Sequence, residues 1–277
     1  MRKRLYATAR LTAPFILAGL MLSACANAPI TGRSQLLVVS EEQAISMSES
    51  AYYEMLKEPA GKGRLDNDAR LKQRVEKITA RIIAQAIKFR PETAHWKWSI
   101  HIIDEPDTVN AWAMAGGRMA LYTGLVKKIK PTDDELAQVL GHEISHALAK
   151  HTAEKMSIAL ATDMAVSIFA PGNTNAAKVA TVAIELPNSR TAESEADRIG
   201  IELAARAGYN PNAAVTLWSK MAQQGNGKTI EFLSTHPAPQ TRIDVLSRLA
   251  PQMMPYYRKK AAHPVYQFKP EATKLRG

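Results

Sequence analysis

The chain has 277 residues, of which 46% are hydrophobic and 22% are charged, a balance that is typical of a globular domain and excludes a disordered or fibrous protein. Its formal net charge is +10. Most lysines and arginines are scattered, apart from Arg258-Lys259-Lys260, so we expect a negatively charged membrane surface as a neighbour and no nucleic acid as a partner.

The first 24 residues have the layout of a signal peptide. Basic residues precede an apolar run from Leu11 to Leu22, which is shorter than the roughly 20 residues of a membrane span. The run ends in Leu22-Ser23-Ala24-Cys25, which resembles the bacterial lipobox, where cleavage before the cysteine exposes it for lipid attachment. Cys25 is the only cysteine, so an internal disulfide is excluded. The alternative is an ordinary signal peptide with an incidental cysteine. By resemblance to lipoprotein sorting, Ala26 in the next position favours the outer membrane.

The mature chain divides into three parts. We expect a lipidated tether over residues 25–39, one catalytic domain over 40–250 and a basic tail over 251–277. Ser40 and Gln43 form a capping box that predicts a helix to about Lys57. A second helix is predicted over residues 68–87 from apolar residues at helical spacing.

A small sheet is predicted next. Trp96, Trp98, Ile100 and Ile102 alternate with polar residues, which is the pattern of a half-buried strand. Asn110 to Met114 and Arg118 to Tyr122 flank Gly116-Gly117 as a hairpin.

Several helices are predicted after the hairpin. Thr132 and Glu135 form a capping box for a central helix, which places apolar residues on its buried side. The stretch Met156 to Ala170 is apolar, and residues 171–175 after it have loop composition. A further helix is predicted from about Thr191 to Ala207, and Asn210-Pro211 marks the start of another. The predicted fold is therefore α+β and mainly helical, with a small sheet beside the central helix.

The central helix carries the most specific motif, His142-Glu143-Ile144-Ser145-His146. Four-residue spacing puts both imidazoles on one face of a helix, where they can bind one metal ion. Catalytic zinc sites use three protein ligands and leave one position for water. Glu143 is placed to take a proton from that water and deliver it to a leaving amine. We therefore expect one zinc ion per chain.

A later acidic helix offers the third ligand. Glu193 and Asp197 are four residues apart and share a face, whereas Glu195 points elsewhere. We assign Glu193 to the metal and Asp197 to the support of a ligating imidazole. Taken alone, an acidic helix start is more often a solvated surface.

These motifs, followed by Thr235-His236-Pro237 and Arg242, resemble the metallopeptidase family of HtpX and the CAAX prenyl proteases (metallopeptidase family forty-eight). The similarity is greatest to small bacterial LoiP-type outer-membrane lipoprotein peptidases. The resemblance implies a gluzincin-type fold with His142, His146 and Glu193 on zinc and Glu143 as the base. It also implies that His236 and Arg242 line the cleft.

The same resemblance implies that the hairpin edge formed by Asn110, Ala111, Trp112 and Ala113 holds a substrate as an added strand. The remaining histidines match no motif, so surface or sheet positions are expected for His95, His101, His151 and His263. His151 lies five residues after His146 and is expected to point away from the ligand face.

Two functions are compatible with these patterns. The first is a lipid-anchored zinc endopeptidase that cuts unfolded or misassembled proteins of a bacterial cell envelope, facing the periplasm. The second is a lipid-anchored, chaperone-like binding factor whose zinc site is largely latent because the apolar stretch from Met156 to Ala170 and the loop that follows it cover the cleft. The intact Glu143 favours the peptidase.

Overall fold

The computed structural model describes residues 25–167, 181, 183, 185–224, 230–237, 239–258 and 263–269. The expected signal peptide (1–24) and loop (171–175) lie outside the described residues, as do the last three residues of the apolar stretch and parts of the expected basic tail.

The described chain begins with a short hairpin and a long helix. Strand β1 (Cys25–Asn27) pairs with β2 (Ser34–Leu36) in antiparallel fashion. Helix α2 (Glu41–Gly61) follows. Ser40 caps it and forms the predicted capping box with Gln43, because the two side chains satisfy each other's otherwise unpaired backbone N–H groups.

The second helix is found where it is predicted, but the strand after it is shorter. Asp68 caps α3 (Ala69–Phe89). A 3₁₀ helix, η1 (Pro91–His95), then precedes β3 (Ser99–Ile103). The prediction that the strand includes Trp96 and Trp98 is wrong: the η1 turn holds them outside the strand, and the Trp98 indole N–H donates to the Thr93 carbonyl at 2.9 Å.

The predicted hairpin is confirmed. Strand β4 (Ala111–Ala113) pairs antiparallel with β5 (Arg118–Tyr122), and β5 also pairs parallel with β3, giving the order β3-β5-β4. Gly116 and Gly117 both have φ near +80° in the turn, a conformation that glycine adopts without steric cost. In the described part of the chain, β4 is therefore an edge strand.

The central helices follow the sheet. Helix α4 (Thr123–Ile129) leads to α5 (Asp133–Leu148), which begins with the predicted capping box of Thr132 and Glu135. Lys150 has φ of +61°, so the chain changes direction before α6 (His151–Ser167). Helix α6 contains the first part of the apolar stretch.

Four more helices follow in the described residues: α8 (Arg190–Arg206), α9 (Ala213–Gln224), α10 (Glu231–Thr235) and α11 (Pro239–Arg258). Helix α11 continues past position 250, at which we expected a tail to begin. Farther on, the Tyr266 backbone N–H donates to the Ala80 carbonyl at 3.0 Å.

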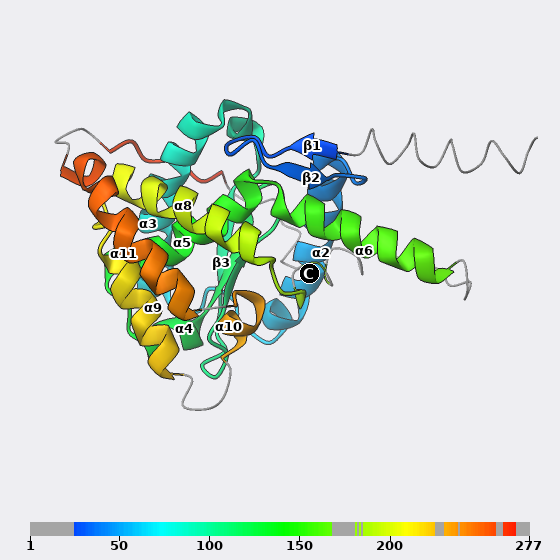
Figure 1. Ribbon diagram of the computed structural model, residues 1–277. Coiled ribbons are helices and arrows are strands. Elements are labelled where there is room, and N and C mark those ends of the chain that lie inside the picture. The colour runs from blue at the N-terminus through cyan, green and yellow to red at the C-terminus, as the bar shows by residue number, and fades with distance from the viewer. Residues whose placement is uncertain are drawn as a thin grey trace, which may run out of the picture.

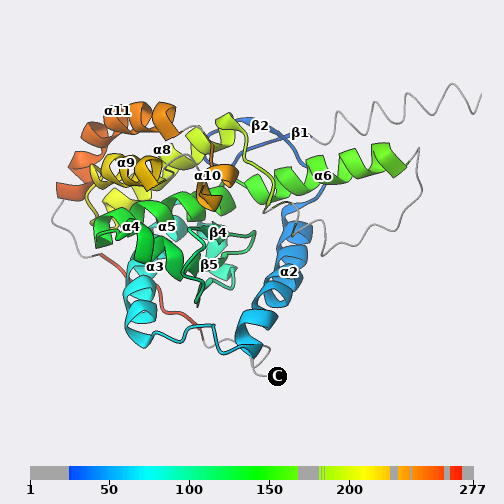
Figure 2. The same ribbon diagram turned by 90° about the horizontal axis from the view of Figure 1, so that it is seen from below.

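Helix α5 lies among α3, α8 and α9, while α2 and α6 extend on the other side of the sheet (Figures 1 and 2). Helices α5 and α8 meet at two glycines. A Cβ on Gly141 would lie 2.8 Å from the Gly200 carbonyl oxygen, and a Cβ on Gly200 would lie 2.8 Å from the backbone nitrogen of His142. Only glycine permits this backbone approach, which brings the metal motif of α5 against the acidic motif of α8.

The α+β, mainly helical fold class is confirmed. Among the described residues, no helix combines the length and the apolar composition needed to cross a membrane.

Candidate metal centre

The helix α5 motif faces the interior of the domain. His142, Glu143 and His146 are only 3–4% exposed. The imidazole Nε2 atoms of the two histidines lie 3.0 Å apart, as their four-residue spacing on a helix predicts.

Two residues from other elements meet this pair. The Glu193 carboxylate, on the first turn of α8, lies 3.4 Å from His142 Nε2 and 3.3 Å from His146 Nε2. His236, which ends α10, places its Nδ1 2.9 Å from the Glu193 carboxylate and 3.2 Å from His142 Nε2. One ligand atom from each of the four residues lies within 4.8 Å of all the others.

This donor set fits a zinc ion. Zinc prefers imidazole nitrogen and carboxylate oxygen at about 2.0–2.2 Å in tetrahedral geometry, so its ligand atoms lie roughly 3.3 Å apart, close to the separations seen here. The Glu193 carboxylate is buried and has Arg242 Nη1 at 2.5 Å on Oε2, and both of its oxygens lie within 3.4 Å of a ligating imidazole. A buried carboxylate among imidazole nitrogens is the kind of donor set that a zinc ion binds.

The electrostatics of the ligands also suit a cation. Burial opposes ionisation of Glu193, but the charges of His236 and His142 outweigh it and hold the pKa of Glu193 well below its usual range. Burial lowers the pKa of His146 well below its usual value, which favours the neutral imidazole that binds metal.

His142 has the opposite shift. Burial and Arg242 favour its neutral form, but Glu193 and Asp197 outweigh them and raise the pKa of His142 to about 9. Because a ligating imidazole must be deprotonated, metal binding there releases a proton, and acid weakens metal binding.

Asp197 and Arg242 lie behind the ligands. The Asp197 carboxylate is 3.1 Å from His142 Nδ1, where it can accept that proton and leave Nε2 free for a metal. Arg242 pairs with both carboxylates: its Nη1 is 2.5 Å from Glu193 and its Nε donates to Asp197 at 2.8 Å. The guanidinium lies 3.6 Å from the centroid of the Trp218 ring.

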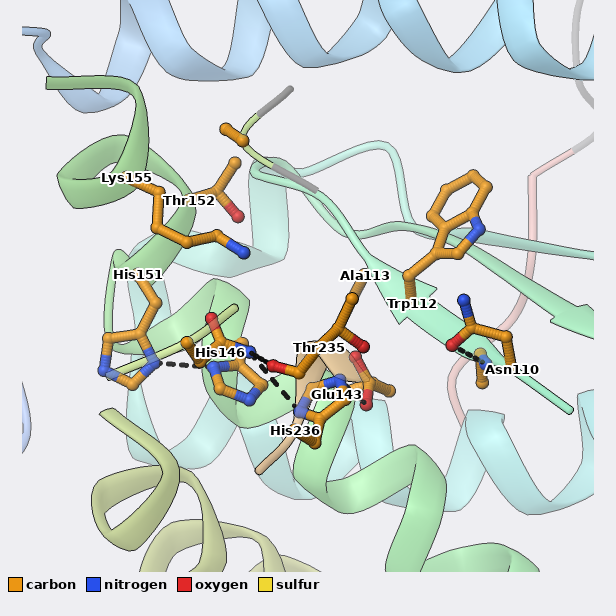
Figure 3. Close-up of a pocket in the computed structure, with 13 residues that line it drawn as sticks. Asn110, Trp112, Ala113, Glu143, His146, His151, Thr152, Lys155, Thr235 and His236 are labelled. Atoms are coloured by element: carbon orange, nitrogen blue, oxygen red, sulfur yellow. Dashed lines mark hydrogen bonds and ion pairs between the residues drawn. The ribbon is translucent and has the colours of Figure 1, made fainter. Parts of the chain in front are cut away.

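A pocket opens beside the ligands (Figure 3). Its lining includes Glu143, His146 and His236 together with residues 110–113, but not Arg242. Arg242, like His142 and Glu193, lies buried next to this pocket, where its ion pairs with Glu193 and Asp197 hold it; that it lines the cleft stays a prediction. The expected substrate strand does border the pocket.

Glu143 is the acidic group inside this pocket. Burial raises its pKa above the usual carboxyl value, against the opposing charges of His236 and His142. Its Oε1 is buried without a hydrogen-bond partner in the described part of the protein and lies 3.4 Å from His236 Nε2. A carboxylate with a raised pKa and a free acceptor oxygen can exchange protons with a reacting group.

The sequence analysis missed the three pocket residues on α6, which are His151, Thr152 and Lys155. His151 is 1% exposed, and its Nδ1 lies 2.7 Å from His146 Nδ1. The expectation that His151 points away is wrong, because α5 ends at Leu148 and the left-handed Lys150 interrupts the helical periodicity. The sequence from Ala147 to Thr152 contains no glycine or proline that would have predicted this break between the two helices. Lys155 also lines the pocket, and burial lowers its pKa to about 8.

The other histidines lie outside the centre. His101 is in β3, the sheet position expected for it, and its Nδ1 is 2.5 Å from the Asp66 carboxylate. His95 ends η1 and is exposed, and His263 contacts the Arg206 carbonyl.

Comparison with known proteins identifies relatives along most of the chain. The profile of "Peptidase family M48" matches residues 68–250. Human "Metalloendopeptidase OMA1, mitochondrial" is 34% identical over 245 residues, which are 82% of this chain and 46% of the human protein. "Mitochondrial metalloendopeptidase OMA1" of Schizosaccharomyces pombe is 34% identical over 230 residues, 81% of this chain and 66% of that protein.

A bacterial relative matches over the same region. "Beta-barrel assembly-enhancing protease" of Escherichia coli is 28% identical over 247 residues, which are 82% of this chain and 48% of that protein. The chain thus spans about half to two thirds of the length of these three relatives.

Proposed function

The chain belongs to peptidase family M48 and carries the zinc metallopeptidase domain of that family, and we propose that the protein is a lipid-anchored endopeptidase of a bacterial cell envelope that cuts unfolded or misassembled proteins. The observation that carries the proposal is the convergence of His142, His146 and Glu193 beside a buried Glu143, next to β4, which is an edge strand among the described residues.

Each residue of the centre has a proposed role. His142, His146 and Glu193 hold the zinc ion, which when bound polarises a peptide carbonyl and acidifies water. Glu143 takes the proton of the attacking water and passes it to the nitrogen of the leaving amine. Asp197 orients His142, and Arg242 holds the two carboxylates of α8 in place through its ion pairs.

His236 has two candidate roles. With its Nδ1 2.9 Å from Glu193, it is close enough to act as a fourth metal ligand in a resting state. If it swings away, it can donate a hydrogen bond to the oxyanion that forms at the peptide carbonyl. The two roles exclude each other at any moment, and we favour the oxyanion role during turnover.

We propose that β4 binds the substrate backbone. It is an edge strand in the described part of the chain, and its residues border the pocket that contains Glu143. An added strand is held by main-chain hydrogen bonds, which tolerate many side chains. That tolerance suits a peptidase that acts on unfolded proteins. Trp112 is 5% exposed and packs against Tyr52, so its side chain belongs to the core.

The proposed location rests on Cys25 and its lipobox-like context. The name of the E. coli relative refers to β-barrel assembly, which supports an envelope role, whereas the OMA1 relatives are named as mitochondrial. The Cys25→Ser variant should lose lipid attachment. Fractionation of the native protein into the soluble phase after cell breakage would contradict the anchor, and metabolic labelling with palmitate tests it directly.

A purified-protein assay tests the activity. The mature protein with zinc should digest casein, a chelator should abolish digestion, and the Glu143→Gln variant, which keeps the three ligands, should digest casein at least about a hundredfold more slowly. Cleavage that survives chelation, or that is unchanged in Glu143→Gln, would contradict the proposal.

A second candidate function is a chaperone-like binder with a latent zinc site. It is favoured by the small size of the pocket beside the ligands, which is about 30 Å³. A bound peptide needs the pocket walls to move apart. Protection of casein from aggregation without any cleavage would support this function.

A further inference from the structure

His146 is held from behind by another histidine. Its Nδ1, which faces away from the cluster, lies 2.7 Å from Nδ1 of His151. The opposite nitrogen of His151, Nε2, lies 2.9 Å from Glu195 Oε2. Figure 3 shows His151 on α6 with its ring directed at His146. The side chains of His151 and Glu195 are 1% and 4% exposed, so water does not compete for these contacts.

The partners determine where the protons lie. An ionised carboxylate can only accept, so His151 Nε2–H donates to Glu195. In a neutral imidazole the other nitrogen then carries a lone pair, and His151 Nδ1 accepts from His146 Nδ1–H. This leaves the lone pair of His146 on Nε2, which is the nitrogen that faces His142 and Glu193.

Glu195 is itself braced by the segment between β1 and β2. The Arg33 Nε donates to Glu195 at 2.9 Å, and the Thr31 hydroxyl donates to its other oxygen. Arg33 also forms a two-point ion pair with Glu154 of α6, at 2.6 and 2.9 Å. The contacts therefore run without interruption from residues 31–33, just after Cys25, to the imidazole of His146.

We propose that His151 and Glu195 are positioning residues, which fix the tautomer and orientation of His146, and that Arg33 braces them from the segment next to the proposed lipid anchor. The proposal rests on the proposed role of His146 as a zinc ligand. A partner that holds the outer nitrogen of a ligating histidine typically contributes about 10–100-fold to metal affinity.

Substitution of His151 tests the first step. His151→Leu removes the acceptor for His146 Nδ1–H and should weaken zinc binding by about 10–100-fold. In His151→Asn the side-chain oxygen can take the place of Nδ1, so this variant should recover most of the affinity. The matched control is His95→Leu, at an exposed site outside the centre. The zinc dissociation constant is measured by chelator competition at fixed pH, and melting of the metal-free proteins shows that each variant is folded.

Cobalt substitution adds a spectroscopic signature, because the visible bands of Co²⁺ respond to ligand geometry. They should change in His151→Leu and return toward native in His151→Asn. Equal zinc affinities and cobalt spectra in native protein and His151→Leu would overturn the proposal. If His151→Leu fails to fold, His151→Asn compared with His151→Ser still decides, and equal affinities in that pair would also overturn it.

Arg33 tests the connection to the N-terminal segment. Arg33→Gln should weaken zinc binding measurably, but by less than His151→Leu does, because Glu195 keeps its contact with His151. The control is Arg64→Gln, since Arg64 also pairs with two carboxylates, Glu58 and Glu105, at similar exposure. A purely structural role for Arg33 would lower the melting temperature and leave the zinc affinity unchanged, which would refute the connection.

The His146→Ala variant separates this inference from the proposed site. If His146→Ala binds zinc as tightly as the native protein, the proposed ligand set is wrong. If it loses zinc but His151→Leu does not, the ligand set holds and the positioning role of His151 is refuted.

Discussion

Replacement of Arg242 by Met should both destabilise the domain and weaken the metal centre. Arg242 is 4% exposed, pairs with Glu193 at 2.5 Å and with Asp197 at 2.8 Å, and packs on Trp218. Methionine keeps much of the apolar stem but removes the cation, so two buried carboxylates lose a partner.

The expected cost follows from that burial. Removal of one partner of a buried ion pair typically costs about 3–5 kcal/mol, because the other charge stays buried without compensation. For a domain of this size each kcal/mol lowers the melting temperature by about 2–4 °C. The metal-free Arg242→Met protein should therefore melt about 6–20 °C below the native protein. Zinc should restore only part of the loss, since it neutralises Glu193 and leaves Asp197 without its cation.

A matched control separates stability from metal binding. Arg90 is equally buried and pairs with Glu41 and Glu92, away from the centre. Arg90→Met should also lower the melting temperature but leave the zinc dissociation constant unchanged, whereas Arg242→Met should weaken zinc binding as well. Calorimetry with and without zinc measures both quantities. An Arg242→Met protein that melts at the native temperature, or that binds zinc with native affinity, would refute the reasoning.

Four further outcomes are expected. Glu143→Gln should keep its zinc but lower turnover by about a hundredfold or more, because the acid/base step is lost; metal analysis with peptide cleavage checks this. His236→Ala should lower turnover by about a hundredfold with full zinc content if His236 stabilises the oxyanion, whereas faster cleavage would show that it blocks the site as a ligand. Gly200→Ala should lower both the melting temperature and zinc content, because its Cβ would meet the α5 backbone at 2.8 Å; native values for both would contradict the packing argument. Burial opposes ionisation of Asp66, but the hydrogen bond and charge of His101 outweigh it and lower the pKa of Asp66. Its stabilising effect is therefore present above the unfolded pKa of about 4 and is lost as the pH falls through the folded value. The difference in urea midpoint between native protein and Asp66→Asn should shrink below about pH 4, and a constant difference would contradict the assignment.

The sequence by itself determined the features that depend on neighbouring residues. Capping boxes at Ser40 and Thr132, the hairpin around Gly116-Gly117 and the shared face of His142 and His146 all follow from local geometry, and the structure has them where they are predicted. Four-residue spacing also places Glu193 and Asp197 on one side of α8, since the period of a helix is fixed by its backbone.

Only the tertiary structure decided which distant groups meet. The close approach of Gly141 and Gly200 brings α8 against α5, so Glu193 reaches the histidine pair. Helical periodicity predicts that His151 points away, yet the left-handed Lys150 ends that periodicity and turns the His151 ring onto His146. Arg242 of α11 meets Glu193 and Asp197 of α8 because two buried carboxylates need a cation as a partner. Contacts of this kind depend on long-range packing and on the cost of leaving a buried charge without a partner, and neither has a signature in the spacing of residues along the chain.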